Sequence, residues 1–341
     1  MKIAHIIASS EPGGMENHLV TLCNALSKTC QVSVIAPTWR AGTFAPEVKV
    51  IAFDGLTSSR YNPIIGFKLW RLLEALSPDI VHAHGTKSAI LVSRPCFKAY
   101  ARVATVHGIK KHTYTFSFFD HIIAVSQIVA DSLRPYPATV VYNGIHIPDA
   151  PLPPPCNTPP LALAIGRLAP VKGFDDLIAA WTRVNDAHLQ IAGDGPSRPR
   201  LESLIARHNL QHRVKMLGAR EDIAMLLNAC DLAVISSHRE GASLVFAEAL
   251  AHRRPVVSTD CGLMSGLMKP SQLVTPKSPI ALASKINAAL ADLPAYSATL
   301  APLYDLCRRE MTVEAMAQKT LAVYHAFARA RPAAPHQQGV T

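Results

Sequence analysis

The sequence predicts an α/β protein with two doubly wound domains, each built on a parallel sheet. Short apolar runs alternate with helical patterns along most of the chain, which is typical of successive βαβ units. The 341 residues are long for a single core and sufficient for two domains of about 150 residues each. A stretch at 148–160 holds seven prolines in 13 residues and divides the pattern in two. Since proline lacks an N–H and fixes φ, we interpret this stretch as a semi-rigid linker.

The predicted strands of the first half are mostly continuous apolar runs, as expected for strands buried on both faces of a parallel sheet. A helix follows the first strand, because Leu19, Leu22, Cys23 and Leu26 recur at spacings of three and four residues. The strands are predicted at 2–8, 31–37, 48–53, 79–84, 101–108, 121–126 and 138–144.

The second half repeats the strand–helix alternation directly after the prolines. Strands are predicted at 161–167, 188–195, 213–218, 231–237 and 254–260, and helices at 173–184, 198–208, 221–229, 243–252, 278–292 and 312–329. We expect a first domain at 1–150, a linker at 151–160, a second domain at 161–304, C-terminal helices at 305–330 that pack back toward the first domain, and a frayed tail at 331–341.

Composition limits the class of protein. No run of 18 apolar residues and no cleavable leader pattern is present, and the seven cysteines lack C-x-x-C spacing. We therefore expect a cytoplasmic chain without a disulfide framework or structural zinc site. The net charge is +10, and no acidic residue occurs between Ile80 and Phe119. The cations of 87–111 could attract phosphates, nucleic acid or an anionic membrane surface, or could form an ordinary solvated basic face.

The segment after the predicted strand 231–237 carries the strongest functional signal, R-E-G-A-S-L-V-F-A-E-A-L-A at 239–251. Gly241 permits a tight turn, and Ser243 is a predicted N-cap. The backbone N–H groups of Leu244 and Val245 then lie at the positive end of a helix, which favours phosphate.

Two carboxylates frame the same segment. Glu240 precedes the helix and Glu248 lies on its second turn, so each could accept hydrogen bonds from a different part of a sugar-containing ligand. The alternative is that Glu248 is a solvated helix residue and Glu240 a partner of the helix dipole. The apolar surroundings of Glu248 favour the functional interpretation, because an unpaired buried carboxylate is costly.

Glycines and histidines mark the first half. Gly13 and Gly14, in the first strand-to-helix loop, could let the backbone approach a phosphate or sugar, or could form a plain turn. His107 ends a predicted strand and could contact a sugar hydroxyl or transfer a proton. His82 and His84 share one face of a strand. No carboxylate or cysteine accompanies them, so the sequence predicts no metal site.

Several segments together resemble the retaining glycosyltransferase family 4, which has the GT-B fold of two Rossmann-like domains facing a cleft. The segment 240–248 resembles the family's pair of glutamates separated by seven residues. The resemblance extends to G-R-L-A-P-V-K-G (166–173), A-G-D-G-P (192–196), N-A-C-D-L-A-V-I-S-S (228–237), E-P-G-G (11–14), T-V-H-G (105–108) and Y-N-G-I (142–145).

The resemblance implies an activity and residue roles. Arg167 and Lys172 would neutralise the diphosphate of a nucleotide-sugar donor, Leu244 and Val245 would offer it N–H groups, and no metal cofactor would be needed. Glu240 would contact the donor sugar, Glu248 the ribose, and His107 the cleft near the sugar. The implied enzyme is a retaining, hexosyl-type transferase (EC 2.4) with a donor-binding second domain and an acceptor-side first domain. A UDP-sugar is the favoured donor, and an envelope glycan such as lipopolysaccharide the favoured acceptor, reached at the inner membrane surface through 87–111.

Departures from the family pattern leave alternatives open. Ser243 stands where the family often has proline, Arg253 where it often has glycine, and Cys261-Gly262-Leu263 where Gly-Gly often leads to a glutamate. The alternatives are a nucleotide-sugar epimerase of the same fold and a non-enzymatic sugar-binding protein. A dehydrogenase is disfavoured because G-x-G-x-x-G is absent, and a nucleic-acid partner because no basic segment is interleaved with aromatic residues.

Overall fold

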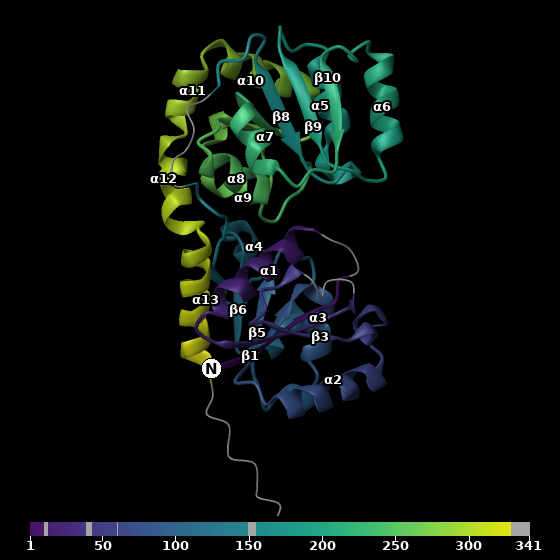
Figure 1. Ribbon diagram of the computed structural model, residues 1–341, viewed down its shortest axis with the longest axis vertical. Coiled ribbons are helices and arrows are strands. Elements are labelled where there is room, and N and C mark those ends of the chain that lie inside the picture. The colour runs from purple at the N-terminus through teal and green to yellow at the C-terminus, as the bar shows by residue number, and fades with distance from the viewer. Residues whose placement is uncertain (10–12, 39–42, 60, 149–154, 329–341) are drawn as a thin grey trace, which may run out of the picture. The chain divides into compact units, whose positions relative to one another are not determined.

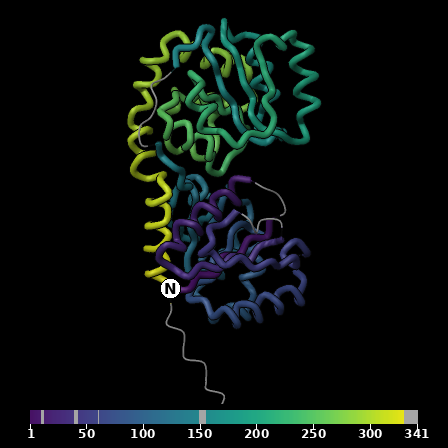
Figure 2. The backbone as a smooth tube through the Cα atoms, viewed as in Figure 1, coloured from purple at the N-terminus to yellow at the C-terminus, as the bar shows by residue number. Residues whose placement is uncertain are grey.

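Two compact units make up the computed structural model (Figure 1). The structure describes residues 1–9, 13–38, 43–59, 61–148 and 155–328, and Figure 2 traces the same path with the other residues in grey. Unit 1 comprises Met1–Ala124, Ser132–Val141 and the chain from Ala317 onward. Unit 2 comprises Val125–Asp131 and Tyr142–Met316. The chain therefore changes unit four times. The predicted tail 331–341 and part of the predicted linker, 151–154, lie outside the described residues.

Unit 1 is built on a seven-stranded parallel sheet in the order β3-β2-β1-β4-β5-β6-β7. The strands are β1 (Lys2–Ile7), β2 (Gln31–Ala36), β3 (Lys49–Ala52), β4 (Ile80–His84), β5 (Ala101–Val106), β6 (His121–Ala124) and β7 (Thr139–Val140). Its helices include α1 (Gly14–Leu26), α2 (Pro63–Leu76) and α3 (Gly85–Val92). The continuous apolar runs form these strands because both faces of the sheet are buried: every residue of β4 and of β5 is buried.

Two helices of unit 1 have no counterpart in the sequence prediction. Helix α2 begins at an N-cap, Asn62, whose side chain accepts from the Ile64 N–H, and proline occupies its first position. Helix α3 begins directly after β4, with only His84 as its N-cap residue. Helix α3 is only eight residues long and its apolar residues fall in its second half, so periodicity alone does not predict it.

Unit 2 is built on a six-stranded parallel sheet in the order β10-β9-β8-β11-β12-β13. The strands are β8 (Leu161–Ile165), β9 (His188–Ala192), β10 (Val214–Gly218), β11 (Leu232–Ile235), β12 (Val256–Thr259) and β13 (Leu273–Val274). The helices are α4 (Gln127–Asp131), α5 (Phe174–Trp181), α6 (Arg198–Arg207), α7 (Ile223–Ala229), α8 (Leu244–Ala251), α9 (Leu263–Leu267), α10 (Pro279–Ala291), α11 (Leu293–Thr299), α12 (Ala301–Glu310) and the first residues of α13 (Val313–Phe327).

Separate apolar clusters cover the two faces of the second sheet. Trp181 of α5 and Ile286 of α10 join one cluster, and Phe246 of α8 and Cys307 of α12 join the other. Alternate strand residues face each cluster, as in β11, where Val234 belongs to the first and its neighbours to the second. Helices on both faces of a parallel sheet make each unit doubly wound, as the sequence predicts.

A buried aspartate fixes the entry into the second sheet. Both carboxylate oxygens of Asp231 are used: Oδ2 accepts from the Leu161 N–H at 2.7 Å and from the Asn157 side chain at 2.8 Å. Oδ1 accepts from the Asn157 N–H at 3.3 Å. These bonds hold the described end of the proline-rich stretch against the start of β11.

The last turns of α13 belong to unit 1. The Tyr324 hydroxyl is hydrogen-bonded to Nδ1 of His82 on β4. The ring of Phe327 stacks on His121 of β6, with 4.6 Å between centroids. The sheet of unit 1 is therefore covered in part by residues from the far end of the chain.

Candidate functional site

The strand order of each sheet reverses direction at one point. In unit 2 the strands β8 and β11 are neighbours there, and their following loops diverge to opposite faces. Ligands of doubly wound proteins bind at the carboxyl ends of the two strands at this switch point. The loop after β8 carries Arg167 and Lys172, and the loop after β11 carries Glu240 and leads into α8. Sequence-predicted site residues thus follow both strands of the switch point.

The loop after β8 depends on a close crossing of two backbones. The Leu168 N–H donates to the Asp194 carbonyl at 2.9 Å, and the Gly166 N–H donates to the Ala192 carbonyl at 3.0 Å. Gly193 has φ +143°, and a Cβ there would lie 1.9 Å from the Gly166 carbonyl oxygen. The glycines of A-G-D-G-P therefore allow the second loop to support the loop that presents Arg167, whose side chain is exposed.

A second close contact holds Lys172. Residues Pro170–Lys172 form a single 3₁₀ turn that ends at Gly173, with φ +62°. A Cβ on Gly173 would lie 2.2 Å from the Ser236 carbonyl oxygen. The Ser236 hydroxyl donates to the Lys172 carbonyl at 2.9 Å. The end of β11 thereby fixes the backbone from which the lysine side chain projects.

Lys172 and Glu240 form an ion pair in which Nζ lies 2.6 Å from Oε1. The Ser237 hydroxyl donates to the same Oε1 at 2.7 Å. The side chains are 24% and 11% exposed, so the pair is shielded from solvent but still reachable. A cation and a carboxylate therefore meet where the β8 and β11 loops converge.

Residues that the sequence prediction missed support Glu240. The Thr259 hydroxyl, at the end of β12, donates to the Ser237 carbonyl at 2.6 Å. Gly262 has φ +56°, and a Cβ there would lie 2.6 Å from the Glu240 carbonyl oxygen. The segment Cys261-Gly262-Leu263, which departs from the family pattern, thus keeps a glycine where the chain passes Glu240. The consecutive serines 236 and 237 are the only sequence signal for the Ser237 hydroxyl, and no sequence signal indicates Thr259.

Helix α8 begins as the sequence predicts. Ser243 is its N-cap, and the serine Oγ accepts from the Phe246 N–H at 3.3 Å while the serine carbonyl accepts from the Ala247 N–H. The N–H groups of Leu244 and Val245, the first two of the helix, take part in neither bond. A positive helix end with two such donors suits an anionic ligand.

Glu248 lies on the second turn of α8 and is half-buried. Burial raises the pKa of its carboxyl. A carboxylate kept partly out of water in this way is a strong acceptor for hydroxyl donors of a ligand.

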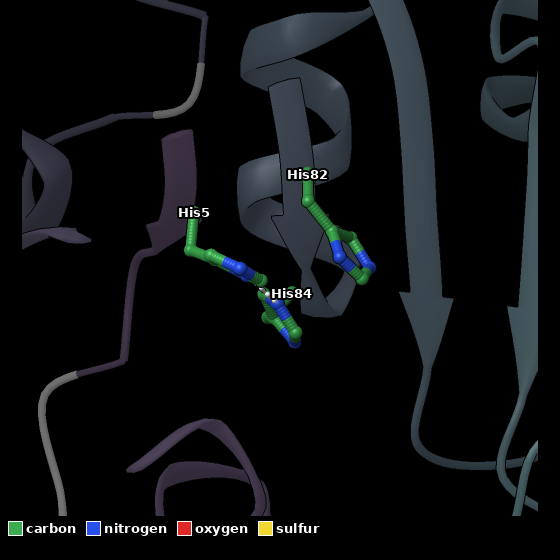
Figure 3. Close-up of side chains that lie close together, drawn as sticks. All are labelled: His5, His82 and His84. Atoms are coloured by element: carbon green, nitrogen blue, oxygen red, sulfur yellow. Dashed lines mark hydrogen bonds between the residues drawn. The ribbon is translucent and has the colours of Figure 1, made fainter. Parts of the chain in front are cut away.

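The remaining predicted residues belong to unit 1. Gly13 and Gly14 are exposed and begin α1, and the Gly13 carbonyl accepts from the Asn17 N–H at 3.1 Å. His107 follows β5 directly. His82 and His84 share a face of β4 as predicted, but they are not isolated. His5 of β1 is paired in register with His82, and Figure 3 shows His5, His82 and His84 gathered together. His5 therefore joins the pair as a third imidazole, a neighbour that the sequence analysis did not place beside them.

The basic stretch 87–111 is less uniform than its sequence implies. Arg102 is 8% exposed, and Lys87, Arg94 and Lys110 each donate to a neighbouring oxygen of unit 1. Lys98 and Lys111 are exposed. Among the described residues, no helix combines the length and apolar character needed to cross a bilayer.

Two family models match most of the chain. The model described as Glycosyltransferase Family 4 matches residues 12–147, and the model described as Glycosyl transferases group 1 matches residues 159–292. Each model matches a different half of the chain, and the group 1 model spans the loops that hold Arg167, Lys172 and Glu240.

Known proteins with similar sequence or structure agree with these matches. The lipopolysaccharide core biosynthesis glycosyltransferase LpsE of Rhizobium meliloti is 27% identical over 274 residues, which cover 76% of this chain and 79% of LpsE. LpsD of the same organism is 26% identical, covering 76% and 78%. The structure of Anabaena HepE in complex with UDP-glucose has a TM-score of 0.79 and 22% identity, covering 96% of this chain and all of HepE. This likeness confirms the predicted GT-B type of fold.

Proposed function

Because this chain belongs to the glycosyltransferases described by the family 4 and group 1 models, we propose that it transfers a hexosyl group from a UDP-sugar to an envelope glycolipid with retention. The observation that carries the proposal is the Lys172–Glu240 ion pair at the switch point of unit 2. A nucleotide sugar has an anionic diphosphate joined to a hydroxyl-rich ring, and such a pair offers one group for each.

The donor diphosphate is the leaving group, and its charge grows as the glycosidic bond breaks. Arg167 and Lys172 supply fixed positive charge, and the Leu244 and Val245 N–H groups add donors at a helix end. On donor binding, the Lys172 ammonium exchanges Glu240 for phosphate oxygens. These groups provide the neutralisation that a divalent cation provides in other transferases, so we propose that the reaction needs no metal.

The two glutamates divide the rest of the donor between them. Glu240, held by Ser237, accepts from hydroxyls of the sugar, and Glu248 accepts from the ribose hydroxyls. Gly13, Gly14 and His107 of unit 1 serve the sugar and acceptor. With retention, the departing phosphate accepts the proton of the acceptor hydroxyl, and the protein contributes positioning and charge stabilisation.

The acceptor class rests on the relatives. LpsE and LpsD are named for lipopolysaccharide core biosynthesis, and HepE was crystallised with UDP-glucose. We propose an envelope glycolipid acceptor, a cytoplasmic location and peripheral contact with the anionic inner membrane surface through the exposed Lys98 and Lys111. Co-sedimentation with anionic vesicles, lost in a Lys98→Glu/Lys111→Glu variant, is the corresponding measurement.

Release of UDP from a panel of UDP-sugars, with and without envelope glycolipid, tests the activity. We expect acceptor-dependent release, and a reduction of about 100-fold or more in Arg167→Ala and Lys172→Ala. Lys215→Ala is the matched control, because Lys215 is an exposed lysine of β10 in the same unit. Wild-type rates in the first two variants would contradict the donor assignment. A free epimerised sugar formed without acceptor would instead identify an epimerase.

Two further readouts address the finer claims. The anomeric configuration of the product, measured by NMR against that of the donor, decides between retention and inversion. Rates with and without added Mg²⁺ or Mn²⁺ decide the metal requirement, and we expect no stimulation.

A further inference from the structure

His238 and Asp176 form a hydrogen-bonded pair beside the two loops of unit 2 that carry Lys172 and Glu240. His238 lies in the loop after β11, and Asp176 lies in the first turn of α5, directly after the β8 loop. Nε2 of His238 is 2.6 Å from Oδ2 of Asp176, and both side chains are partly buried. A carboxylate can only accept, so the His238 Nε2–H donates to it. No step of the proposed function uses either residue.

His238 also holds the turn from which the lysine projects. The His238 N–H donates to the Val171 carbonyl at 2.8 Å. A Cβ added to Gly173 would lie 2.9 Å from Nε2 of His238, so the imidazole lies directly against this glycine. His238 therefore contacts the chain on both sides of Lys172, at Val171 through its backbone and at Gly173 through its ring.

The two acidic residues at the start of α5 have different partners. Asp176 accepts from His238, whereas Oδ2 of Asp175 accepts from the Arg200 guanidinium at 3.0 Å. Both carboxylates lie in the first turn of the helix, whose positive end stabilises negative charge. They share the helix end but not the contact with the β11 loop. Asp175 is therefore a matched control for Asp176.

The pair gains importance when a donor binds. Under the proposed function, on which this inference rests, the Lys172 ammonium leaves Glu240 for phosphate oxygens. The ion pair then no longer joins the two loops, whereas none of the contacts of His238 involves that ammonium. The hydroxyl of Ser236 still bonds the Lys172 carbonyl, and the His238–Asp176 pair still joins α5 to the β11 loop.

We propose that His238 and Asp176 are positioning residues that keep the Lys172 turn in register with the β11 loop while the ammonium exchanges Glu240 for the donor diphosphate. They act through Lys172 and are assigned no contact with the donor itself. The precision matters because a displacement of about 1 Å at a group that contacts the substrate can lower the rate by about 100-fold.

UDP affinity in double-mutant cycles tests whether the pair acts through Lys172. His238→Ala and Asp176→Ala should each weaken UDP binding about 10-fold, and the double variant should bind no more weakly than either one. His238→Gln retains an N–H donor and should bind within about 3-fold of the wild type. In a Lys172→Ala background, His238→Ala should change affinity by less than about 2-fold, because the residue that it positions is gone. Asp175→Ala should bind as the wild type does.

Amide hydrogen exchange of residues 170–173 measures the turn without a donor. The Lys172 N–H is bonded to the Ala169 carbonyl and the Gly173 N–H to the Pro170 carbonyl, so opening of the turn exposes both. His238→Ala and Asp176→Ala should each speed exchange there about 10-fold, and Asp175→Ala should not. If one of the two Ala variants does not fold, the other removes the same contact.

The two measurements separate this inference from the proposed function. A wild type that does not bind UDP would count against the proposed function, and hydrogen exchange would still decide whether the pair holds the turn. Unchanged exchange or unchanged UDP affinity in the Ala variants would overturn the inference. An equal loss of affinity from His238→Ala with and without Lys172 would also overturn it, because the imidazole would then act on another part of the site.

Discussion

Single residues decide whether the donor loops of unit 2 can form. Gly173 is the clearest case, because its φ of +62° is in the left-handed region and a Cβ there would lie 2.2 Å from the Ser236 carbonyl oxygen. The position combines backbone strain with a direct clash.

Gly173→Ala should therefore lower the free energy of unfolding by at least about 2 kcal/mol and displace Lys172 from Glu240. Chemical denaturation measures the first effect, and UDP affinity the second. Gly266→Ala is the matched control, since Gly266 lies in α9 and a Cβ on it would meet no atom within 4 Å. A Gly173→Ala protein as stable as this control would show that the loop adapts.

Glu248 gives a pH-dependent prediction. Its pKa is raised in the folded protein, so the folded state binds the carboxyl proton more tightly than the unfolded state. The ionised carboxylate then lowers stability once pH rises above the unfolded value, and this loss is complete above the folded value. Glu248→Gln should be more stable than the wild type at pH 7, by on the order of 1 kcal/mol, and the difference should disappear as pH falls below the unfolded pKa.

Denaturation curves across that pH range measure the change in stability, and UDP titration measures whether the same substitution weakens donor binding. If Glu248 accepts from the ribose, the stabilised variant should bind UDP more weakly than the wild type. A variant that gains stability without losing UDP affinity would show that Glu248 does not contact the donor, and the other assignments would be unaffected.

At the scale of elements, the first turn of α8 combines two tasks in neighbouring residues. The Ser243 side chain caps the helix, whereas the next two N–H groups are available to an anion. An aspartate caps as well as a serine but adds a negative charge.

Ser243→Asp should keep the free energy of unfolding within a few tenths of a kcal/mol of the wild type while weakening UDP binding about 10-fold. Ser243→Ala should do the reverse, losing about 1 kcal/mol of stability with less effect on affinity. Calorimetric titration and denaturation of both variants would separate the tasks. Equal UDP affinity in the aspartate variant would place the phosphate away from this helix end.

Some of the site residues and helices could be predicted from the sequence and others could not. The motif residues Arg167, Lys172 and Glu240 could be identified because strand, glycine and charge recur in a short, ordered string. Thr259 and Gly262 could not, since they contact Ser237 and Glu240 from a loop further along the chain. Ser237, three residues from Glu240, was indicated only by the two consecutive serines before the motif. The closeness of His5, His18 and His107 to His84 was missed because the fold of unit 1, and not the sequence, brings these residues together. Helices α2 and α3 were missed because their apolar residues lack a decisive period.

For the whole molecule, helix α13 allows a test of whether the stability of unit 1 depends on the last part of the chain. Its residues from Ala317 onward belong to unit 1, where Tyr324 and Phe327 contact His82 and His121. A chain that ends at Met316 should therefore unfold unit 1 at a lower temperature while retaining UDP affinity in unit 2.

Calorimetry and UDP titration of that shortened chain provide the measurement. Tyr324→Phe serves as a milder comparison, because it removes the hydroxyl that pairs with His82 but keeps the ring. Unchanged melting of the shortened chain would mean that the contacts of α13 contribute little to unit 1.

The four changes of unit along the chain have a consequence for recombination between related genes. Neither unit corresponds to one uninterrupted stretch of coding sequence, because Val125–Asp131 is inserted within the first and the last helix returns to it. A single crossover near the proline codons would therefore replace helix α13 of unit 1 together with most of unit 2. To graft a new donor specificity onto this protein, both segments of unit 2, Val125–Asp131 and Tyr142–Met316, must be exchanged. The native chain from Ala317 onward, which belongs to unit 1, must be retained.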